Sequence, residues 1–180
     1  MEKNIKNFKI SSSNFLQLLS LTILLALFMP TITNAQSGKV NFAGSWALNA
    51  GKSALGDNPG SQRMFGGDFV VTQDANLLTV ARTRTNQNGE TSTQTMKYTL
   101  DGKESVNTSQ RGDSKSTAKW SADGMSLTIE TSRTFDMNGS SMTMKTTEVW
   151  SLTDAKTISI AYAFTGRDGE VKATVVCDKK

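Results

Sequence analysis

Four charged residues stand in segments that alternate like β-strands, on the side of each strand that otherwise carries mostly apolar residues. Arg82 and Arg84 lie in "LLTVARTRT", Arg133 lies in "SLTIETSRTF", and Glu148 lies in "MTMKTTEVW". Successive side chains of a strand point to opposite faces of the sheet, so residues two apart share a face. The residues that share these faces are Leu78, Val80, Leu127, Ile129, Phe135, Met142, Met144, Thr146 and Trp150.

If those faces point inward, two or three guanidinium groups and one carboxylate line an otherwise apolar interior. A buried charge has to be paired, because an unpaired ion is costly to remove from water. The pattern therefore predicts either Arg–Glu pairing or an anionic ligand, whose carboxylate the planar fork of an arginine matches. The alternative is that the arginines lie near strand ends, where their stems pack and their charged groups reach water. The candidate ligand-binding residues are Arg82, Arg84, Arg133, Glu148, Trp150 and Tyr162, the last of which lies on the apolar face of "TISIAYAF".

Residues for catalysis are scarce. The chain contains no histidine, which excludes His-based general base catalysis, Ser-His-Asp triads and His-ligated zinc or haem. Five aspartates occupy turn positions, where the carboxylate accepts hydrogen bonds from nearby backbone N–H groups: Asp74, Asp101, Asp123, Asp154 and Asp168. We therefore expect a protein that is not an enzyme and has no metal and no cofactor. A catalyst built from Asp, Glu, Tyr or Arg ranks third among the possible functions.

Residues 1–35 have the layout of a secretory signal peptide. Three lysines precede an apolar run from Phe15 to Met29, and small or permissive residues stand before a cleavage point after Ala35. The rival interpretation is an uncleaved anchor, but this run is shorter than the ~20 residues that span the hydrocarbon core of a membrane. The sequence thus predicts export to the periplasm or the cell exterior, with residues 36–180 as a single mature domain that has no membrane span.

Charge and cysteine content limit the partners of this domain. The full chain has 20 basic and 16 acidic residues, and the leader holds three lysines and one glutamate, which leaves 17 and 15. Such an even and scattered balance gives no reason to expect nucleic acid. Cys177 is the only cysteine, so no intramolecular disulfide forms. Its place on the apolar face of a strand predicts a buried thiol, the alternative being an intermolecular disulfide.

Alternation and turn signals dominate the chain after residue 40. Dipeptides such as Asn88-Gly89, Asp101-Gly102 and Asp123-Gly124 supply the positive φ angles of tight hairpins. Between the turns we expect about ten strands, near 42–49, 67–74, 76–86, 90–99, 103–110, 114–121, 125–136, 140–152, 156–164 and 170–177. The predicted class is all-β, an antiparallel up-and-down meander of about 8–10 strands closed into a barrel, which protects its edges most completely. Periodicity leaves open whether the sheet closes as a barrel or as a sandwich.

The stretch "FAGSWALN" resembles the first strand of lipocalins and related calycin barrels, where Gly44 and Trp46 match a Gly-x-Trp motif near the closed end. The chain is also similar to small secreted lipocalin-like proteins of bacteria. The resemblance implies an antiparallel barrel around a small or apolar ligand. It also implies a basic side chain from the last strand over the Trp, for which Lys172, Lys179 and Arg167 are the nearest candidates.

Taken together, these features predict an exported protein that binds or carries a small amphipathic or apolar molecule, with an anionic group as one possibility. The alternative is a structural or protein-interaction module whose interior is filled by its own side chains, because small barrels exist both packed and hollow. The sequence identifies neither the ligand nor a protein partner.

Overall fold

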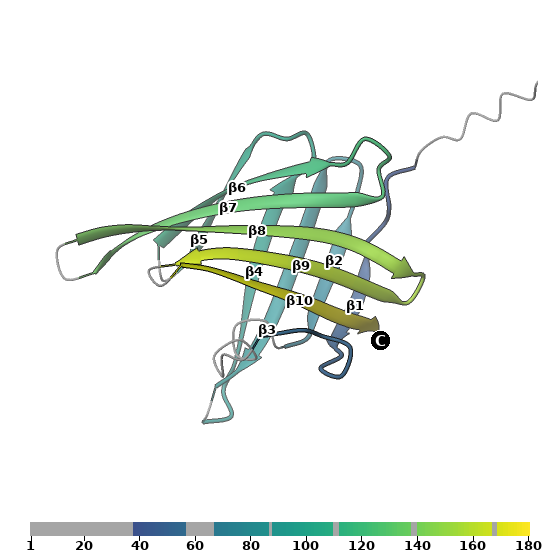
Figure 1. The fold of residues 1–180 in the computed structure, drawn as a ribbon, viewed down its shortest axis with the longest axis horizontal. Coiled ribbons are helices and arrows are strands. Elements are labelled where there is room, and N and C mark those ends of the chain that lie inside the picture. Colours follow the sequence, from purple (N-terminus) through teal and green to yellow (C-terminus); the bar gives the residue numbers. More distant parts are fainter. Residues whose placement is uncertain (1–37, 57–66, 87, 110–111, 138–139, 167–168) are drawn as a thin grey trace, which may run out of the picture. The chain divides into compact units, whose positions relative to one another are not determined.

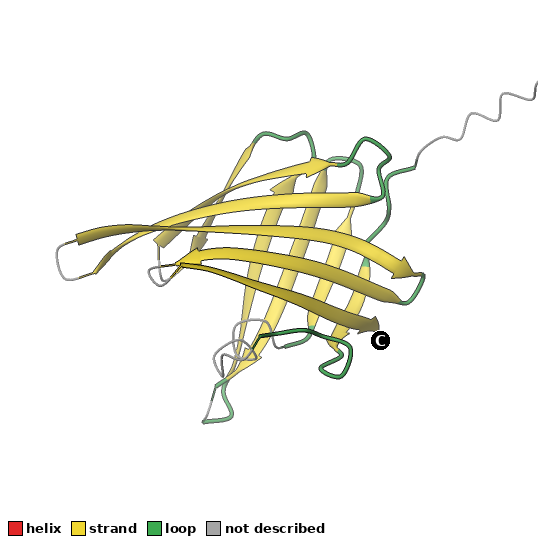
Figure 2. Ribbon diagram, in the orientation of Figure 1, coloured by secondary structure: helices red, strands yellow, loops and turns green. Residues whose placement is uncertain are grey.

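The strands predicted from alternation are present. The computed structural model describes residues 38–56, 67–86, 88–109, 112–137, 140–166 and 169–180, and these form strands and no helix (Figures 1 and 2). The ten strands are β1 (Gly44–Leu48), β2 (Phe69–Gln73), β3 (Leu77–Thr85), β4 (Thr91–Thr99), β5 (Glu104–Ser109), β6 (Gly112–Trp120), β7 (Ser126–Met137), β8 (Ser140–Asp154), β9 (Thr157–Gly166) and β10 (Gly169–Lys179). Among these residues no helix is long and apolar enough to cross a membrane.

The strands form one antiparallel sheet that curls into a nearly closed barrel. Its order is β4-β3-β2-β1-β10-β9-β8-β7-β6-β5. Figure 1 shows β6 to β10 crossing in front of β1 to β4, with the β7–β8 hairpin reaching beyond its neighbours. The first strand pairs with the last, and the two outer strands β4 and β5 lie against each other. The predicted all-β meander is therefore confirmed, and closure as a barrel settles the choice against a sandwich.

The turn aspartates act as their positions predicted. The carboxylate of Asp74 accepts hydrogen bonds from the backbone N–H groups of Asn76 and Leu77. In the same way the carboxylates of Asp101, Asp123 and Asp154 each accept one from the residue two positions later. These four side chains stabilise turns, while Asp168 lies outside the described residues.

One end of the barrel is closed by the segment that precedes β1. Phe42 is fully buried there, stacked on Trp120 and edge-on to Trp150, with 5.8 Å between ring centroids in both pairs. The side-chain amide of Gln73 accepts a hydrogen bond from the Phe42 N–H at 2.9 Å. The same amide donates to the Val40 carbonyl at 2.9 Å. The indole of Trp46 donates to the Phe42 carbonyl at 3.0 Å. Rings and hydrogen bonds together plug this closed end.

Gly44 and Trp46 lie beside the last strand. The Lys179 ammonium stands 5.5 Å from the centre of the Trp46 ring. Lys179 is therefore the basic residue that the calycin resemblance implied, whereas Lys172 pairs with Glu170 at 3.1 Å. Arg167 lies outside the described residues.

Cys177 is buried and free, as its alternation predicted. It faces the interior from β10, where it pairs with Ile158 of β9 and Leu48 of β1. Burial raises the pKa of its thiol to about 11. Because only the thiolate is reactive, Cys177 is a packing residue.

Candidate functional site

The two ends of the barrel interior differ in how tightly they are packed. At the closed end the inward side chains are fully buried, among them Leu127, Ile129, Trp150, Ile158 and Ile160. Towards the other end of the same long strands the inward side chains are only half-buried: Arg133, Phe135, Met142, Met144 and Phe164. We call this second set the half-buried end. Cross-strand pairing brings Arg133 next to Met144 and Phe135 next to Met142.

Arg82 points into the interior from β3 and reaches across it to β9. Its Nη2 donates to the hydroxyl of Tyr162 at 3.1 Å, although the two residues are 80 positions apart. The guanidinium lies 4.7 Å from the ring centre of Phe69 and 5.9 Å from that of Trp150. A guanidinium over aromatic faces is stabilised by cation–π attraction, most strongly where water is excluded.

Glu148 is the charge partner of Arg82. Its Oε2 lies 3.7 Å from Arg82 Nη2 and accepts a hydrogen bond from Trp150 Nε1 at 2.8 Å. The side chains of Arg82 and Glu148 are 23% and 15% exposed, so water screens the pair weakly. The Arg–Glu pairing that alternation predicted is therefore present. We call Arg82, Glu148, Trp150 and Tyr162 the polar cluster.

Electrostatics at the polar cluster shift several pKa values. Burial raises the pKa of Tyr98 and of Tyr162 above the ordinary value, and the nearby Glu148 carboxylate raises both further. For Arg82, burial opposes the charged form, but Tyr162 and Glu148 outweigh it and hold its pKa above the ordinary value. At neutral pH both phenols are therefore protonated and Arg82 is charged.

Arg133 is different because it has an unpaired polar atom. It faces inward from β7, between Ser114 of β6 and Met144 of β8. Its Nε is buried and makes no hydrogen bond to any described residue. Nor does its guanidinium form an ion pair with any of them. The other such buried atom in the described part of the chain is Trp120 Nε1, at the closed end.

Arg84 does not join this arrangement. It shares a strand face with Arg82, as predicted, but its side chain is exposed where β3 pairs with the outer part of β4. Arg84 therefore fits the alternative of an arginine near a strand end that reaches water.

Several buried polar residues of the interior were missed by the sequence interpretation. Tyr98 is 6% exposed on β4 and lies within electrostatic range of Arg82, Glu148 and Arg133. Asn107, Ser114 and Ser116 are buried on β5 and β6. The signal that could have revealed the serines is the alternation of "DSKSTAKW", in which small residues share a face with Trp120.

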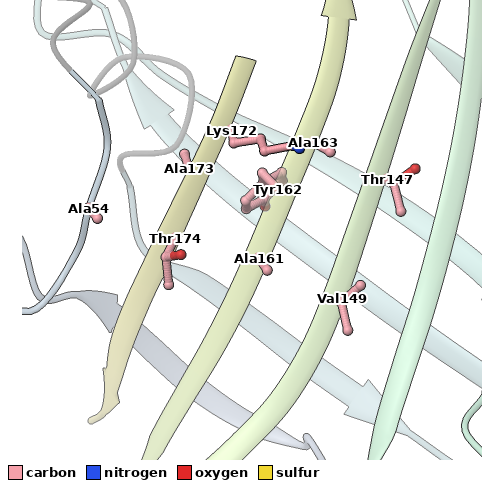
Figure 3. Close-up of a pocket in the computed structure, with 9 residues that line it drawn as sticks. All are labelled: Ala54, Thr147, Val149, Ala161, Tyr162, Ala163, Lys172, Ala173 and Thr174. Atoms are coloured by element: carbon pink, nitrogen blue, oxygen red, sulfur yellow. The ribbon is translucent and has the colours of Figure 1, made fainter. Parts of the chain in front are cut away.

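A shallow groove of about 390 Å³ lies on the outer surface of β8, β9 and β10 (Figure 3). Its side chains alternate with buried ones, so they point away from the interior: Thr147, Val149, Ala161, Ala163 and Thr174. Ala54 borders it and bridges to β10 through its backbone. Lys172 and Tyr162 also line the groove, which is otherwise mostly apolar, and Tyr162 is the one member of the polar cluster that it shares. Among the described residues no group of acidic or cysteine side chains is suited to hold a metal ion.

Comparison with known proteins establishes the fold alone. No protein-family model matches the chain, and no curated protein matches it in sequence. The structure is similar to the crystal structure of zebrafish ileal bile acid-binding protein complexed with cholic acid, with a TM-score of 0.51 and 16% sequence identity. The match covers 77% of this chain and 98% of that chain. The fold is thus an antiparallel β-barrel similar to that of the zebrafish protein.

Proposed function

We propose that this protein binds a small amphipathic anion inside the barrel, with Arg133 as the residue that receives the anionic group. The observation that carries the proposal is the buried, unpartnered Nε of Arg133. A buried donor without an acceptor costs about 1 to 3 kcal/mol. A carboxylate, sulfonate or phosphate would remove that cost and would pair with the guanidinium.

The surroundings of Arg133 favour a ligand with an apolar body. Met144 is its cross-strand neighbour, and Phe135 and Met142 form the next pair of the half-buried end. Methionine side chains are flexible and polarisable, so they adapt to ligands of different shape. An aliphatic or aromatic body packed on these residues would complete their burial.

The pairing of Arg82 with Glu148 supports Arg133 as the anion receptor. Glu148 already neutralises Arg82, and the Tyr162 hydroxyl accepts a hydrogen bond from the Arg82 guanidinium. An anion at the polar cluster would have to compete with that carboxylate, whereas none competes for Arg133 among the described residues. The fold is also compatible with the proposal, since the similar zebrafish protein was crystallised with cholic acid.

A second candidate is a packed interaction module without a ligand. It is favoured by the solid filling of the closed end with Phe42, Trp46, Phe69 and Trp150, together with the internal neutralisation of Arg82. In that case Arg133 would be hydrated and the interior would admit no probe.

Export remains part of the proposal. The basic, apolar and cleavage-site regions of residues 1–35 support secretion of the mature domain. Mass spectrometry of the protein from its own cells tests this, because the denatured mass should correspond to residues 36–180. Extra mass seen only under native conditions would reveal a bound small molecule.

A titration with 1-anilinonaphthalene-8-sulfonate, an apolar anionic fluorophore, tests the site itself. We expect saturable binding that weakens about tenfold or more in Arg133→Met, the equivalent of ~1.4 kcal/mol. Lys115→Met is the matched control, because Lys115 is exposed and paired with Glu104 on the outer surface. Equal affinity for Arg133→Met and Lys115→Met would contradict the assignment of Arg133, and absence of probe binding would favour the packed module.

A further inference from the structure

The barrel has one seam that no backbone ladder closes. β4 and β5 are consecutive in the chain, joined by a turn at Asp101-Gly102, yet they are the two ends of the hydrogen-bonded sheet order. The turn residues predicted an ordinary hairpin. The structure instead gives two adjacent strands whose backbones are not paired with each other.

Side chains of β5 take the place of the missing ladder. The Lys97 N–H donates to Asn107 Oδ1 at 2.7 Å, and Asn107 Nδ2 donates to the Lys97 carbonyl at 2.9 Å. Two residues closer to the turn, the Thr99 N–H donates to Ser105 Oγ at 2.9 Å. The Thr99 and Ser105 hydroxyls lie 3.2 Å apart. Asn107 thus satisfies both backbone groups of Lys97, as a paired strand would, but through a side chain that is able to rotate away.

The seam lies next to Arg133. Cross-strand pairing places Asn107 opposite Ser114, and Ser114 opposite Arg133. With strands about 4.8 Å apart, the backbones of Asn107 and Arg133 are separated by about 10 Å. Asn107, Ser114 and Arg133 are thus successive cross-strand neighbours on the inner face. Opening at Asn107 therefore exposes the inner face of β5 and β6 beside the unpartnered Arg133 Nε.

We propose that the β4–β5 seam is the gate of the barrel, that Asn107 and Ser105 are its side-chain latches, and that ligand passes through it to Arg133. The last clause rests on the proposed function, while the first two concern the barrel alone. The turn at Asp101-Gly102 joins the two strands, and both latches have to release before the seam opens. Releasing it breaks the four hydrogen bonds that these two side chains make to Lys97 and Thr99, whereas the other strand pairs are held by backbone ladders.

Amide hydrogen exchange tests the gate without any ligand. The N–H groups of Lys97 and Thr99 should exchange at least about tenfold faster than that of Tyr98, which alternation directs to the β3–β4 ladder. Ser105→Ala should accelerate exchange at Thr99, and Asn107→Ala at Lys97. Ser116→Ala is the matched control, because Ser116 pairs with Ser105 but bonds to Thr131 across the paired β6–β7 strands. Equal exchange at Lys97, Thr99 and Tyr98 would overturn the gate.

A disulfide across the seam tests passage. The Thr99→Cys/Ser105→Cys variant replaces two hydroxyls 3.2 Å apart, and Cys177 stays in place because burial keeps its thiol protonated. Stopped-flow mixing with 1-anilinonaphthalene-8-sulfonate should show association and dissociation slowed about tenfold or more in the oxidised form and restored by reduction, with little change in affinity. Equal rates in the two forms would overturn passage through the seam. A wild-type protein that binds no probe would instead contradict the proposed function, and amide exchange would still decide the gate.

Discussion

The Lys179 ammonium lies over the Trp46 ring, 5.5 Å from its centre, in space that exists because residue 44 is glycine. A Cβ atom on Gly44 would stand 2.7 Å from Lys179 Cε and 3.3 Å from Nζ. The backbone of Gly44 has φ +149°, a region that residues with side chains rarely adopt. The Gly-x-Trp motif therefore supplies two of the three residues in this contact between the first and last strands.

Gly44→Ala should lower the free energy of unfolding by about 1 to 3 kcal/mol, through backbone strain and displacement of Lys179 from the ring. Urea denaturation measures the loss. Gly89→Ala is the control for strain alone, because Gly89 has φ +83° and a Cβ there would meet nothing within 4 Å. In a Lys179→Ala background the cost of Gly44→Ala should fall, and an unchanged cost would show that the lysine contact contributes nothing.

Phe42→Ala should destabilise the barrel by about 3 to 4 kcal/mol, because it removes a fully buried ring from between two tryptophans. Thermal and urea unfolding measure this loss. Val70→Ala on β2, whose side chain is 47% exposed, should change stability by less than about 0.5 kcal/mol. A small loss for Phe42→Ala would mean that the segment before β1 is not a structural plug.

Both tyrosines of the chain should resist ionisation while the protein is folded. Their pKa values lie above the unfolded value of about 10 because of burial and the Glu148 charge. The folded state then binds more protons than the unfolded state above pH ~10, so stability is full below that pH and falls as the pH rises. Absorbance at 295 nm should show phenolate appearing only together with the loss of barrel structure. A smooth titration near pH 10 with the fold intact would contradict the buried positions of Tyr98 and Tyr162.

Alternation predicted the strands and inward positions of Arg82 and Glu148, because a period of two reports which residues share a face. It placed Arg82 and Arg84 together, although only Arg82 lies where the barrel surrounds it. Burial along one face depends on where a strand leaves the barrel, and that depends on the curl of the whole sheet.

Contacts across the interior could not be predicted from alternation either, because they also depend on the curl of the whole sheet. The bond between Arg82 and Tyr162 joins strands that are not sheet neighbours. The β4–β5 seam was hidden as well, because Asp101-Gly102 has the residues of a normal hairpin turn. The side chains of Asn107 and Ser105, rather than the turn, determine how the two strands are joined.

Replacing Glu148 by glutamine removes the negative charge of the polar cluster and leaves the positive charge of Arg82. The variant should be less stable than the wild type but should bind an anionic probe more tightly. Arg82 would lose the carboxylate 3.7 Å away but keep the Tyr162 hydroxyl, and a glutamine oxygen could still accept from the Trp150 indole. We expect a loss of about 1 to 2 kcal/mol in the free energy of unfolding, less than for a wholly buried pair because both side chains retain some exposure.

The same Glu148→Gln variant should bind 1-anilinonaphthalene-8-sulfonate about three- to tenfold more tightly, because a repelling carboxylate is gone and Arg82 gains free donors. Glu130→Gln is the matched control, since it removes one negative charge from the outer surface of the neighbouring strand β7. A gain confined to Glu148→Gln would place the anion in the interior beside the two arginines. An equal gain in both variants would reflect net charge alone, and no gain in either would contradict binding of an anion near the polar cluster.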